Sequence, residues 1–329
     1  MIKDTCKTCG KLAFSKTVED AVRRYAGANR YDTAAKLSKG MYTKSDYAVI
    51  TTGLDFHDAL IAVPLAQAYN APLLLGTEKH ITDQTLAELK RLKVKNVIVI
   101  STGSAIGAAA KAELKGYKVT NITGKNYFET AANVATALQK KSGKAPTTIF
   151  FATSGSYADA LSASPVAAIK GAPIIYLKNT GSIDSATAKY LKSVKGKVKN
   201  AYVIGGDGVI SNAMMKNVAK TLGLTSGKTV VRVAGANRYE TGAAVNNKFK
   251  SVLTGLGVCV AKGLDFPDAL AGGVFAAKNK VPLFLADGSK LQDVQSSYLK
   301  SKNPRYIYIS GGTGAVSDDL IKVIAKASV

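Results

Sequence analysis

Three aspartates, Asp58, Asp159 and Asp268, recur at matching places in the chain, and each is followed by Ala-Leu at the start of an apolar segment. Carboxylates at such positions could hold a ligand or act in catalysis. They could also accept hydrogen bonds from free N–H groups at the start of a helix, or pair with an arginine. Because a structural requirement must be met in every unit while an active site is needed once, the repetition favours the structural role.

Two arginines, Arg30 and Arg238, occupy the same position in two copies of the phrase AGANRY. A third, divergent copy, TGKNYFET, spans residues 123–130 and has Tyr127 at that position. We expect each arginine to pair with the matching aspartate of its own or of an adjacent unit, because a guanidinium binds a carboxylate through two parallel hydrogen bonds.

The other reactive side chains do not form a catalytic constellation. His57 and His80 are the only histidines, neither recurs in the other repeats, and no serine or cysteine has a repeated base beside it. The CKTC pair, Cys6 and Cys9, has too few companions for a zinc site, so a local disulfide or a frayed tail is favoured over a metal or redox pair. Cys259 lies alone in an apolar run. We therefore predict no enzyme activity, no metal and no cofactor.

The glycine-rich segment SGGTG, residues 310–314, invites comparison with phosphate-binding loops, because backbone N–H groups at a helix start attract anions. The segment has neither the GxGxxG nor the GxxxxGKS spacing of such loops. Tight turns between a strand and a helix account for its glycines.

The segments that position these residues recur three times in the same order. Each AGANRY-type phrase is followed by an apolar block and then by a block that contains glycine. The apolar blocks span residues 49–75, 150–177 and 258–285, and the blocks with glycine span residues 96–107, 201–211 and 307–317. An ordered triple repeat of this kind indicates three copies of one structural unit.

Each unit has the pattern of an α/β fold. Short apolar runs such as VITT and PLLL are typical of strands buried on both faces, and we expect the PLLL-type segments to be inner strands. HDALIAVPLAQAY predicts a helix that Asp55 could cap, TDQTLAELKRL predicts another with Thr82 and Asp83 as candidate caps, and YDTAAKLS predicts a helix before the first strand. The order strand–helix–strand–helix–strand predicts an open, mostly parallel sheet, with ligands at the carboxyl ends of its strands.

The 329 residues suit two or three domains. We predict an N-terminal tail or linker at residues 1–22, followed by repeat 1 (23–119), repeat 2 (120–229) and repeat 3 (230–329). The net charge of +23 is spread over all three repeats: repeat 2 has 14 basic and 4 acidic residues, a net of +10, and its neighbours have +6 each. Such a field attracts polyanions. No apolar run approaches the ~18 residues of a membrane span.

The motifs R-x-A-G-x-x-R-Y-x-T, G-x-D-F-x-D-A-L, A-P-L-L-L and V-x-I-x-G-G-x-G-A-V-S strongly resemble the cell wall binding repeat 2 family. Its modules occur in tandem threes in surface proteins of Gram-positive bacteria, clostridia above all. The resemblance covers nearly everything from Arg23 to Ala327. It implies three Rossmann- or Toprim-like units in a pseudo-threefold arrangement within one monomeric chain. It also implies non-covalent attachment to the wall through an anionic polymer.

The resemblance further implies a set of site residues. The family motif P-[IL]-L-L, which is tied to polymer binding, falls on residues 72–75, 173–176 and 282–285. The predicted polymer-binding residues are Arg30, Arg238, Asp58, Asp159, Asp268, Leu73, Leu74, Leu75, Ile174, Ile175, Tyr176, Leu283, Phe284 and Leu285. Repeat 2 departs from the family pattern, since Tyr127 replaces the arginine and Ser154-Gly155-Ser156 replaces G-L-D.

The leading hypothesis is an extracellular anchor that holds a surface protein to the wall by multivalent binding of an anionic polysaccharide or a teichoic-acid-like polymer. Such proteins usually carry an effector module, and none is visible in this chain. The N-terminus also lacks the long apolar region of a signal peptide. Taken literally, this implies a cytoplasmic chain, whereas an anchor trimmed from a larger secreted protein explains both observations.

Two other classes of protein are alternatives. A nucleotide- or nucleic-acid-binding α/β protein would account for the charge, but it needs aromatic platforms or a real phosphate loop. A wall hydrolase needs a catalytic pair, which the sequence does not provide.

Overall fold

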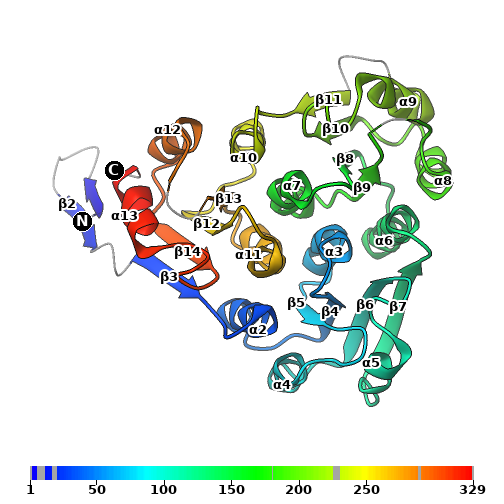
Figure 1. Ribbon diagram of the computed structural model, residues 1–329, viewed down its shortest axis with the longest axis horizontal. Helices are drawn as coiled ribbons and strands as arrows, with labels where there is room; N and C mark the ends of the chain where they lie inside the picture. Colours follow the sequence, from blue (N-terminus) through cyan, green and yellow to red (C-terminus); the bar gives the residue numbers. More distant parts are fainter. Residues whose placement is uncertain are drawn as a thin grey trace.

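The structure is a computed structural model that describes residues 2–5, 12–16, 21–179, 181–224, 230–287 and 290–327. Within these residues the chain forms three four-stranded parallel sheets, preceded by an antiparallel pair of strands, β1 (Ile2–Thr5) and β2 (Leu12–Lys16). The sheets and their helices surround a common centre (Figure 1). The predicted α/β class, with three parallel units in a pseudo-threefold arrangement, is confirmed. Cys6 and Cys9 lie outside the described residues.

The sheets share one topology, with strand orders β5-β4-β6-β7, β9-β8-β10-β11 and β13-β12-β14-β3. The strands of sheet 1 are β4 (Tyr47–Thr52), β5 (Leu73–Gly76), β6 (Asn96–Thr102) and β7 (Lys118–Gly124). Those of sheet 2 are β8 (Thr148–Thr153), β9 (Ile174–Leu177), β10 (Asn200–Ile204) and β11 (Val230–Val233). Those of sheet 3 are β12 (Gly257–Lys262), β13 (Leu283–Ala286), β14 (Tyr306–Ser310) and β3 (Val22–Tyr25).

The fourth strand of each sheet comes from a neighbouring repeat. β7 leads into the TGKNYFET phrase of repeat 2 but pairs with β6, and β11 leads into the second AGANRY but pairs with β10. Sheet 3 is completed by β3, from the start of the chain, which pairs in parallel with β14. These strands were not predicted from the sequence, since VRRY and VVRV are short and carry charged residues. The predicted boundary after residue 119 falls inside β7.

The helices follow the same repetition. Repeat 1 contains α2 (Arg30–Met41), α3 (His57–Ala68), α4 (Asp83–Arg91) and α5 (Ala108–Ala112). Repeat 2 contains α6 (Tyr127–Ser142), α7 (Tyr157–Ile169), α8 (Ser185–Ser193) and α9 (Asn212–Leu222). Repeat 3 contains α10 (Arg238–Lys248), the 3-10 turn η1 (Pro267–Ala269), α11 (Gly272–Lys278), α12 (Asp293–Lys302) and α13 (Asp318–Ala327).

Three helices link one sheet to the next. α2 contacts β3 of sheet 3 and β5 of sheet 1, α6 contacts β7 and β9, and α10 contacts β11 and β13. The PLLL-type strands β5, β9 and β13 are therefore edge strands in the hydrogen-bonded order, and the expectation of inner strands is wrong. They are nevertheless buried, because a helix covers each of these edges, where a further strand could otherwise pair.

The centre of the molecule is formed by α3, α7 and α11, which pack against one another (Figure 1). They belong to one apolar core that runs through all three repeats, with two smaller cores on the outer faces of sheets 1 and 3. Gly273 of α11 shows how closely they approach, since a Cβ there would lie 2.6 Å from Ser164 Oγ of α7. The repeats therefore share their main source of apolar burial.

The helices that carry the repeated phrase begin at an asparagine. The Asn29 and Asn237 side chains accept hydrogen bonds from backbone N–H groups of α2 and α10, and Asn126 does the same for α6. Among the predicted caps, Asp55 accepts from the backbone N–H of His57 at 2.8 Å, whereas Thr82 makes no side-chain cap bond. The asparagine of AGANRY is thus a helix N-cap.

Candidate functional site

The carboxyl ends of β4, β8 and β12 lead into three loops that meet at the centre of one edge of the molecule. We call residues 53–58, 154–159 and 263–268 the axial loops. Phe56, Tyr157 and Phe266 occupy the same position in the three loops, and their ring centroids are 5.8, 5.7 and 5.7 Å apart. This aromatic triangle is half-buried. This triangle was not predicted from the sequence, although each loop has an aromatic residue two positions before its aspartate.

Both arginines reach from one repeat to the preceding one. Arg30 Nη1 donates a hydrogen bond to Gly53 O in its own repeat at 2.5 Å, and its guanidinium lies 5.9 Å from the ring centroid of Phe266 in repeat 3. Arg238 Nη1 donates to Gly263 O at 2.6 Å and to the Tyr157 hydroxyl of repeat 2 at 2.9 Å. Its guanidinium lies 5.5 Å from the Tyr157 centroid. Each arginine therefore sits over an aromatic ring of the triangle.

The expected pairing of these arginines with the repeated aspartates is wrong. Within the described residues, no ion pair joins Arg30 or Arg238 to Asp58, Asp159 or Asp268. The arginines instead use backbone carbonyls as acceptors, which sequence alone does not reveal. Burial raises the pKa of Asp159. The positive charge of Arg238 acts to lower that pKa, although no ion pair joins these two described side chains.

The three aspartates are packed against the turns that follow the third strand of each sheet. Asp58, 2% exposed, accepts hydrogen bonds from the backbone N–H of Thr102 at 2.8 Å and from its hydroxyl at 2.6 Å. Burial raises the pKa of Asp58, although both bonds from Thr102 act to lower it. The carboxylate of Asp58 is therefore held by the protein and turned away from solvent, which agrees with a structural role.

In repeats 2 and 3 a glycine lies where the aspartate packs against the turn. Gly205 and Gly311 have φ of +105° and +114°, a region that residues with a side chain rarely adopt. A Cβ at Gly205 would lie 2.5 Å from Asp159 Oδ2, and one at Gly311 would lie 2.7 Å from Asp268 Oδ2. Gly311 of SGGTG and its counterpart Gly205 in repeat 2 thus make room for a carboxylate, and their positive φ fits the predicted tight turn between strand and helix.

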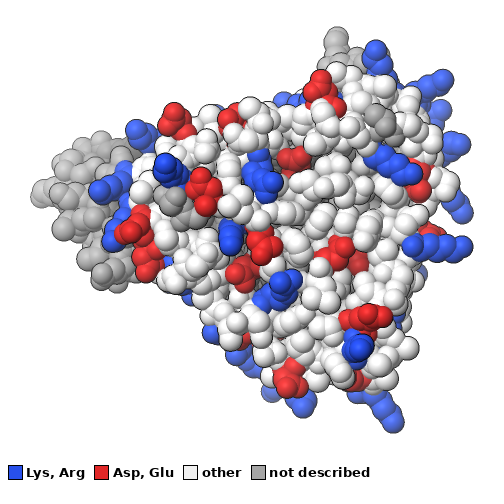
Figure 2. Space-filling view, viewed as in Figure 1, with Lys and Arg blue, Asp and Glu red and all other residues white. Residues whose placement is uncertain are grey.

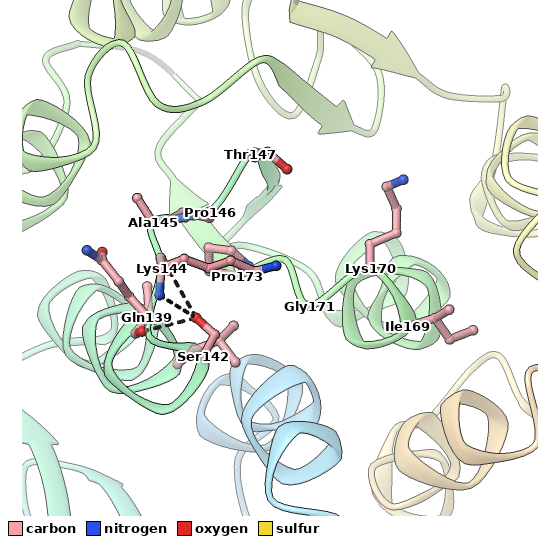
Figure 3. Close-up of a pocket in the computed structure, with 12 residues that line it drawn as sticks. Gln139, Ser142, Lys144, Ala145, Pro146, Thr147, Ile169, Lys170, Gly171 and Pro173 are labelled. Carbon is pink, nitrogen blue, oxygen red and sulfur yellow. Dashed lines mark hydrogen bonds between the residues drawn. The ribbon is translucent and has the colours of Figure 1, made fainter.

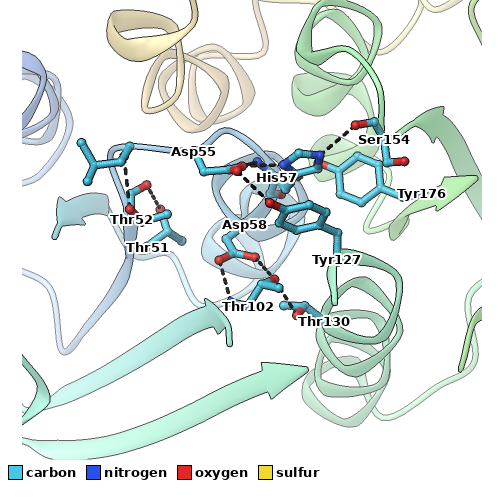
Figure 4. A network of polar contacts seen from close by, with 11 residues as sticks. Thr51, Thr52, Asp55, His57, Asp58, Thr102, Tyr127, Thr130, Ser154 and Tyr176 are labelled. Atoms are coloured by element: carbon cyan, nitrogen blue, oxygen red, sulfur yellow. Dashed lines mark hydrogen bonds and ion pairs between the residues drawn. The ribbon is translucent and has the colours of Figure 1, made fainter. Parts of the chain in front are cut away.

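Where repeats 1 and 2 meet, which we call joint 1/2, a polar network replaces the arginine (Figure 4). Tyr127 stacks on His57 with centroids 3.5 Å apart, and its hydroxyl donates to Asp55 at 3.0 Å. One ring nitrogen of His57 contacts Asp55 and the other lies 2.8 Å from Ser154 O of repeat 2. Burial by itself raises the pKa of Asp55, but the hydrogen bonds from His57 and Tyr127 outweigh it and hold that pKa below its usual value.

The residues of the P-[IL]-L-L motif lie within the sheets. Their side chains are at most 3% exposed in β5, β9 and β13; they are Leu73, Leu74, Leu75, Ile174, Ile175, Tyr176, Leu283, Phe284 and Leu285. Only Tyr176 adds a polar contact, since its hydroxyl donates to His57 O at 2.9 Å across joint 1/2. In this structure the motif builds the edge strands and leaves the following loop, not its own side chains, to face solvent.

Cavities lie at both the carboxyl and the amino edges of the sheets. A cavity of about 190 Å³ is lined by Lys262, Asp265 and Asp268 beside the axial loop of repeat 3. A larger one, of about 350 Å³, lies at the amino edge of sheet 2, where Lys144, Thr147 and Pro173 are among the residues that line it (Figure 3). A cavity at the amino edge was not predicted, because ligands were expected at the carboxyl ends of the strands.

Charge is distributed unevenly over the surface. On the face drawn in Figure 2, lysines and arginines project around the rim, most densely over α8 and α9, while acidic and basic side chains alternate near the centre. Leu54 and Leu264 of the axial loops are exposed by 61% and 62%. We call the edge of the molecule that carries the axial loops the axial edge. Its centre therefore combines apolar, acidic and cationic groups.

In the part of the chain that the structure describes, no group of His, Cys, Asp and Glu could hold a metal ion, and no helix is long and apolar enough to cross a membrane. Cys259 is a buried free thiol whose pKa is raised to about 12 by desolvation, so it is not a reactive cysteine.

Comparison with known proteins agrees with this architecture. The model of the cell wall binding domain 2 (CWB2) family matches residues 24–111, 121–215 and 232–321. Two curated relatives from Bacillus subtilis (strain 168) are the N-acetylmuramoyl-L-alanine amidase LytC, 36% identical over 94% of this chain, and the amidase enhancer, 26% identical over 92%. The chain spans 59% and 40% of the length of these two proteins.

Solved structures show the same assembly. Cwp6 from Clostridium difficile matches 99% of this chain and 50% of its own, with a TM-score of 0.85 and 29% identity. Cwp8 from the same organism matches 94% and 52%, with a TM-score of 0.82 and 26% identity. With three matched repeats, three parallel sheets and these neighbours, the chain belongs to the cell wall binding domain 2 family.

Proposed function

We propose that this chain anchors a surface protein to the Gram-positive cell wall by binding an anionic wall polymer at its axial edge. The observation that carries the proposal is the convergence of the three axial loops, which brings the aromatic triangle together with Arg30 and Arg238. Aromatic rings and guanidinium groups suit a sugar polymer that bears acid groups.

The charge supports capture of a polyanion. The net charge of +23 raises the local concentration of anionic chains around the protein, and the rim of lysines extends this field beyond the axial edge. Several weak contacts along a repetitive polymer add up to tight retention even without a deep pocket.

The residues of the site have different roles in this proposal. Arg30 and Arg238 contact the polymer, while Asp58, Asp159 and Asp268 fix the loop ends against the neighbouring turns. Because the P-[IL]-L-L side chains are buried, that motif supports the site by holding the strands that precede the surface loops. Since the chain spans 59% of LytC and 40% of the amidase enhancer, we assign to it the wall-binding part of a longer extracellular protein, without catalysis of its own.

The test is a sedimentation assay with isolated Gram-positive cell walls. The full chain is expected to sediment with untreated walls and to stay in solution with walls stripped of anionic polymers. Retention should fall steeply as salt rises, because much of the attraction is between charges. Equal binding to stripped walls would exclude the anionic polymer, and equal or tighter binding to DNA beads would favour a nucleic-acid-binding protein.

A further inference from the structure

We infer that the chain has two sites for an acid group and not three, at the joints between repeats 2 and 3 and between repeats 3 and 1. Each site is an arginine held over the aromatic ring of the preceding repeat: Arg238 over Tyr157 at joint 2/3, and Arg30 over Phe266 at joint 3/1. The inference rests on the proposed function and specifies which surfaces of the axial edge take the charged group of the polymer.

One nitrogen of each guanidinium is hydrogen-bonded to the protein, and the other two nitrogens can bind a ligand. Nη1 of Arg30 donates to Gly53 O, and Nη1 of Arg238 donates to Gly263 O and the Tyr157 hydroxyl. Nε and Nη2 of both side chains have no acceptor among the described residues of the protein. A guanidinium binds carboxylate or phosphate oxygens through two parallel N–H groups, so this open side is a fork with its position already fixed.

The third joint has no such fork. At joint 1/2 the arginine position holds Tyr127, which stacks on His57 and donates to Asp55. Both nitrogens of His57 are engaged by protein acceptors, Asp55 on one side and Ser154 O on the other. Tyr127, His57 and Asp55 therefore satisfy one another and offer no guanidinium fork to a ligand.

The surroundings of the two forks indicate what kind of polyanion fits. Asp265 is exposed in the axial loop beside Phe266, and Asp159 lies near Arg238. These carboxylates repel a polymer with closely spaced charges, and the exposed carboxylate of Asp265 can also accept hydrogen bonds from hydroxyl groups. The aromatic rings offer apolar faces on which sugar rings pack. The ligand class is therefore a polysaccharide with spaced acid groups, whether these are carboxylates or phosphates.

The first experiment measures the affinity for isolated walls of Arg30→Gln, Arg238→Gln and the double variant. Arg23→Gln is the matched control, because that guanidinium also lies over a ring, 5.8 Å from the Tyr306 centroid, but away from the axial loops. Each single change should weaken binding by about tenfold, since it removes one of two linked contacts, and the double change by about a hundredfold. The control should stay within about twofold of the unchanged protein, because only long-range attraction is altered.

Two further variants separate a fork from simple charge. Arg238→Lys keeps the charge but loses the bidentate geometry, so it should bind walls as weakly as Arg238→Gln. Tyr127→Phe should leave wall affinity unchanged, because joint 1/2 takes no ligand. Thermal melting of each variant verifies folding, and full rescue by lysine or a tenfold loss in Tyr127→Phe would overturn the two-site assignment.

The second experiment follows the arginine Nε–H signals of the isotopically labelled full chain by NMR, with D-glucuronate and inorganic phosphate as probes. The Arg30 and Arg238 signals should shift with the probe that matches the acid group and the Arg23 signal should not, which also tells a carboxylate from a phosphate. If the unchanged protein does not bind walls, the proposed function fails. If it binds walls while both single glutamine variants bind as tightly as Arg23→Gln and neither probe moves the two signals, only the two-site inference fails.

Discussion

Joint 1/2 and joint 3/1 both connect neighbouring repeats, but they do so through different contacts. At joint 1/2 the chain passes directly from β6 through α5 into β7, so the two repeats are covalently linked where they meet. At joint 3/1 the chain supplies no link, and four residues of β3 pair with β14 in register from Val22 opposite Ile307 to Tyr25 opposite Ser310. The first joint is filled by hydrogen-bonded side chains, whereas the second leaves the fork of Arg30 open.

The difference shows where the structure depends on tertiary contacts alone. Closing joint 3/1 brings together segments from the two ends of the chain, and its entropic cost must be offset by the ladder and by packing. Tyr25 contributes here, since its ring lies 5.0 Å from that of Phe275, which lies 5.0 Å from Tyr308. We therefore expect joint 3/1 to be the more sensitive of the two to loss of a strand or of an aromatic residue.

The largest effect is expected from removing residues 1–25, which deletes β3. Sheet 3 then loses its fourth strand and the closed ring of three repeats is opened, so the free energy of unfolding should fall by about 5 kcal/mol or more. Hydrogen-exchange mass spectrometry should show faster exchange in β14 and α13 while β4 stays protected. Removal of residues 1–20 is the control, and equal protection in the two truncated proteins would show that β3 does not close the ring.

Phe275→Ala tests the packing that supports this closure. The side chain is 1% exposed and contacts the rings of Tyr25 and Tyr308, so its loss should cost about 3–5 kcal/mol in a urea titration. Leu65→Ala, at the same position in α3, should cost a similar amount. The two variants should differ in where they act. Phe275→Ala should speed hydrogen exchange in β3 and Leu65→Ala should not. Faster exchange in β3 in both variants would contradict a specific role of Phe275 in this closure.

Tyr176→Phe should destabilise joint 1/2 by about 1–2 kcal/mol, because the buried carbonyl of His57 loses its hydrogen-bond donor. Tyr190→Phe is a matched control in the same repeat, since the Tyr190 hydroxyl is buried without a hydrogen-bond partner. Its removal should be neutral or stabilising. Equal urea midpoints for the two variants would mean that the contact across joint 1/2 contributes nothing.

The smallest effect concerns pH. The pKa of Asp55 is lowered in the folded state, so its carboxylate stabilises the fold above the usual aspartate pKa of about 3.9, and this contribution is lost as pH falls through the folded value. Asp55→Asn should therefore cost about 1 kcal/mol at neutral pH, a modest amount because the carboxylate is 35% exposed, and progressively less below about pH 4. A stability difference that does not change between pH 7 and pH 3 would contradict this account.

The sequence predicted the repeats, the parallel α/β units and the helices well, because ordered motifs and apolar periodicity are local signals. The fourth strands were missed because their assignment depends on a partner far along the chain: VRRY at residues 22–25 becomes a strand only against β14. That the arginines bind the polymer stays a prediction, and their acceptors within the protein are the backbone carbonyls of Gly53 and Gly263, which no side-chain pattern reveals. The aromatic triangle was missed for a similar reason, since it forms only when three loops meet.

The exchange of strands between repeats has a consequence for how such a protein could be assembled. A chain of one repeat would hold a first strand with no sheet of its own and a sheet that lacks its fourth strand. Separate copies could satisfy each other only as a closed, domain-swapped trimer with threefold symmetry. Such a trimer would dissociate on dilution, because each contact would join different molecules. Joining three copies into one chain makes every exchange intramolecular, so the closed ring of three repeats can persist in a single protein molecule at any dilution.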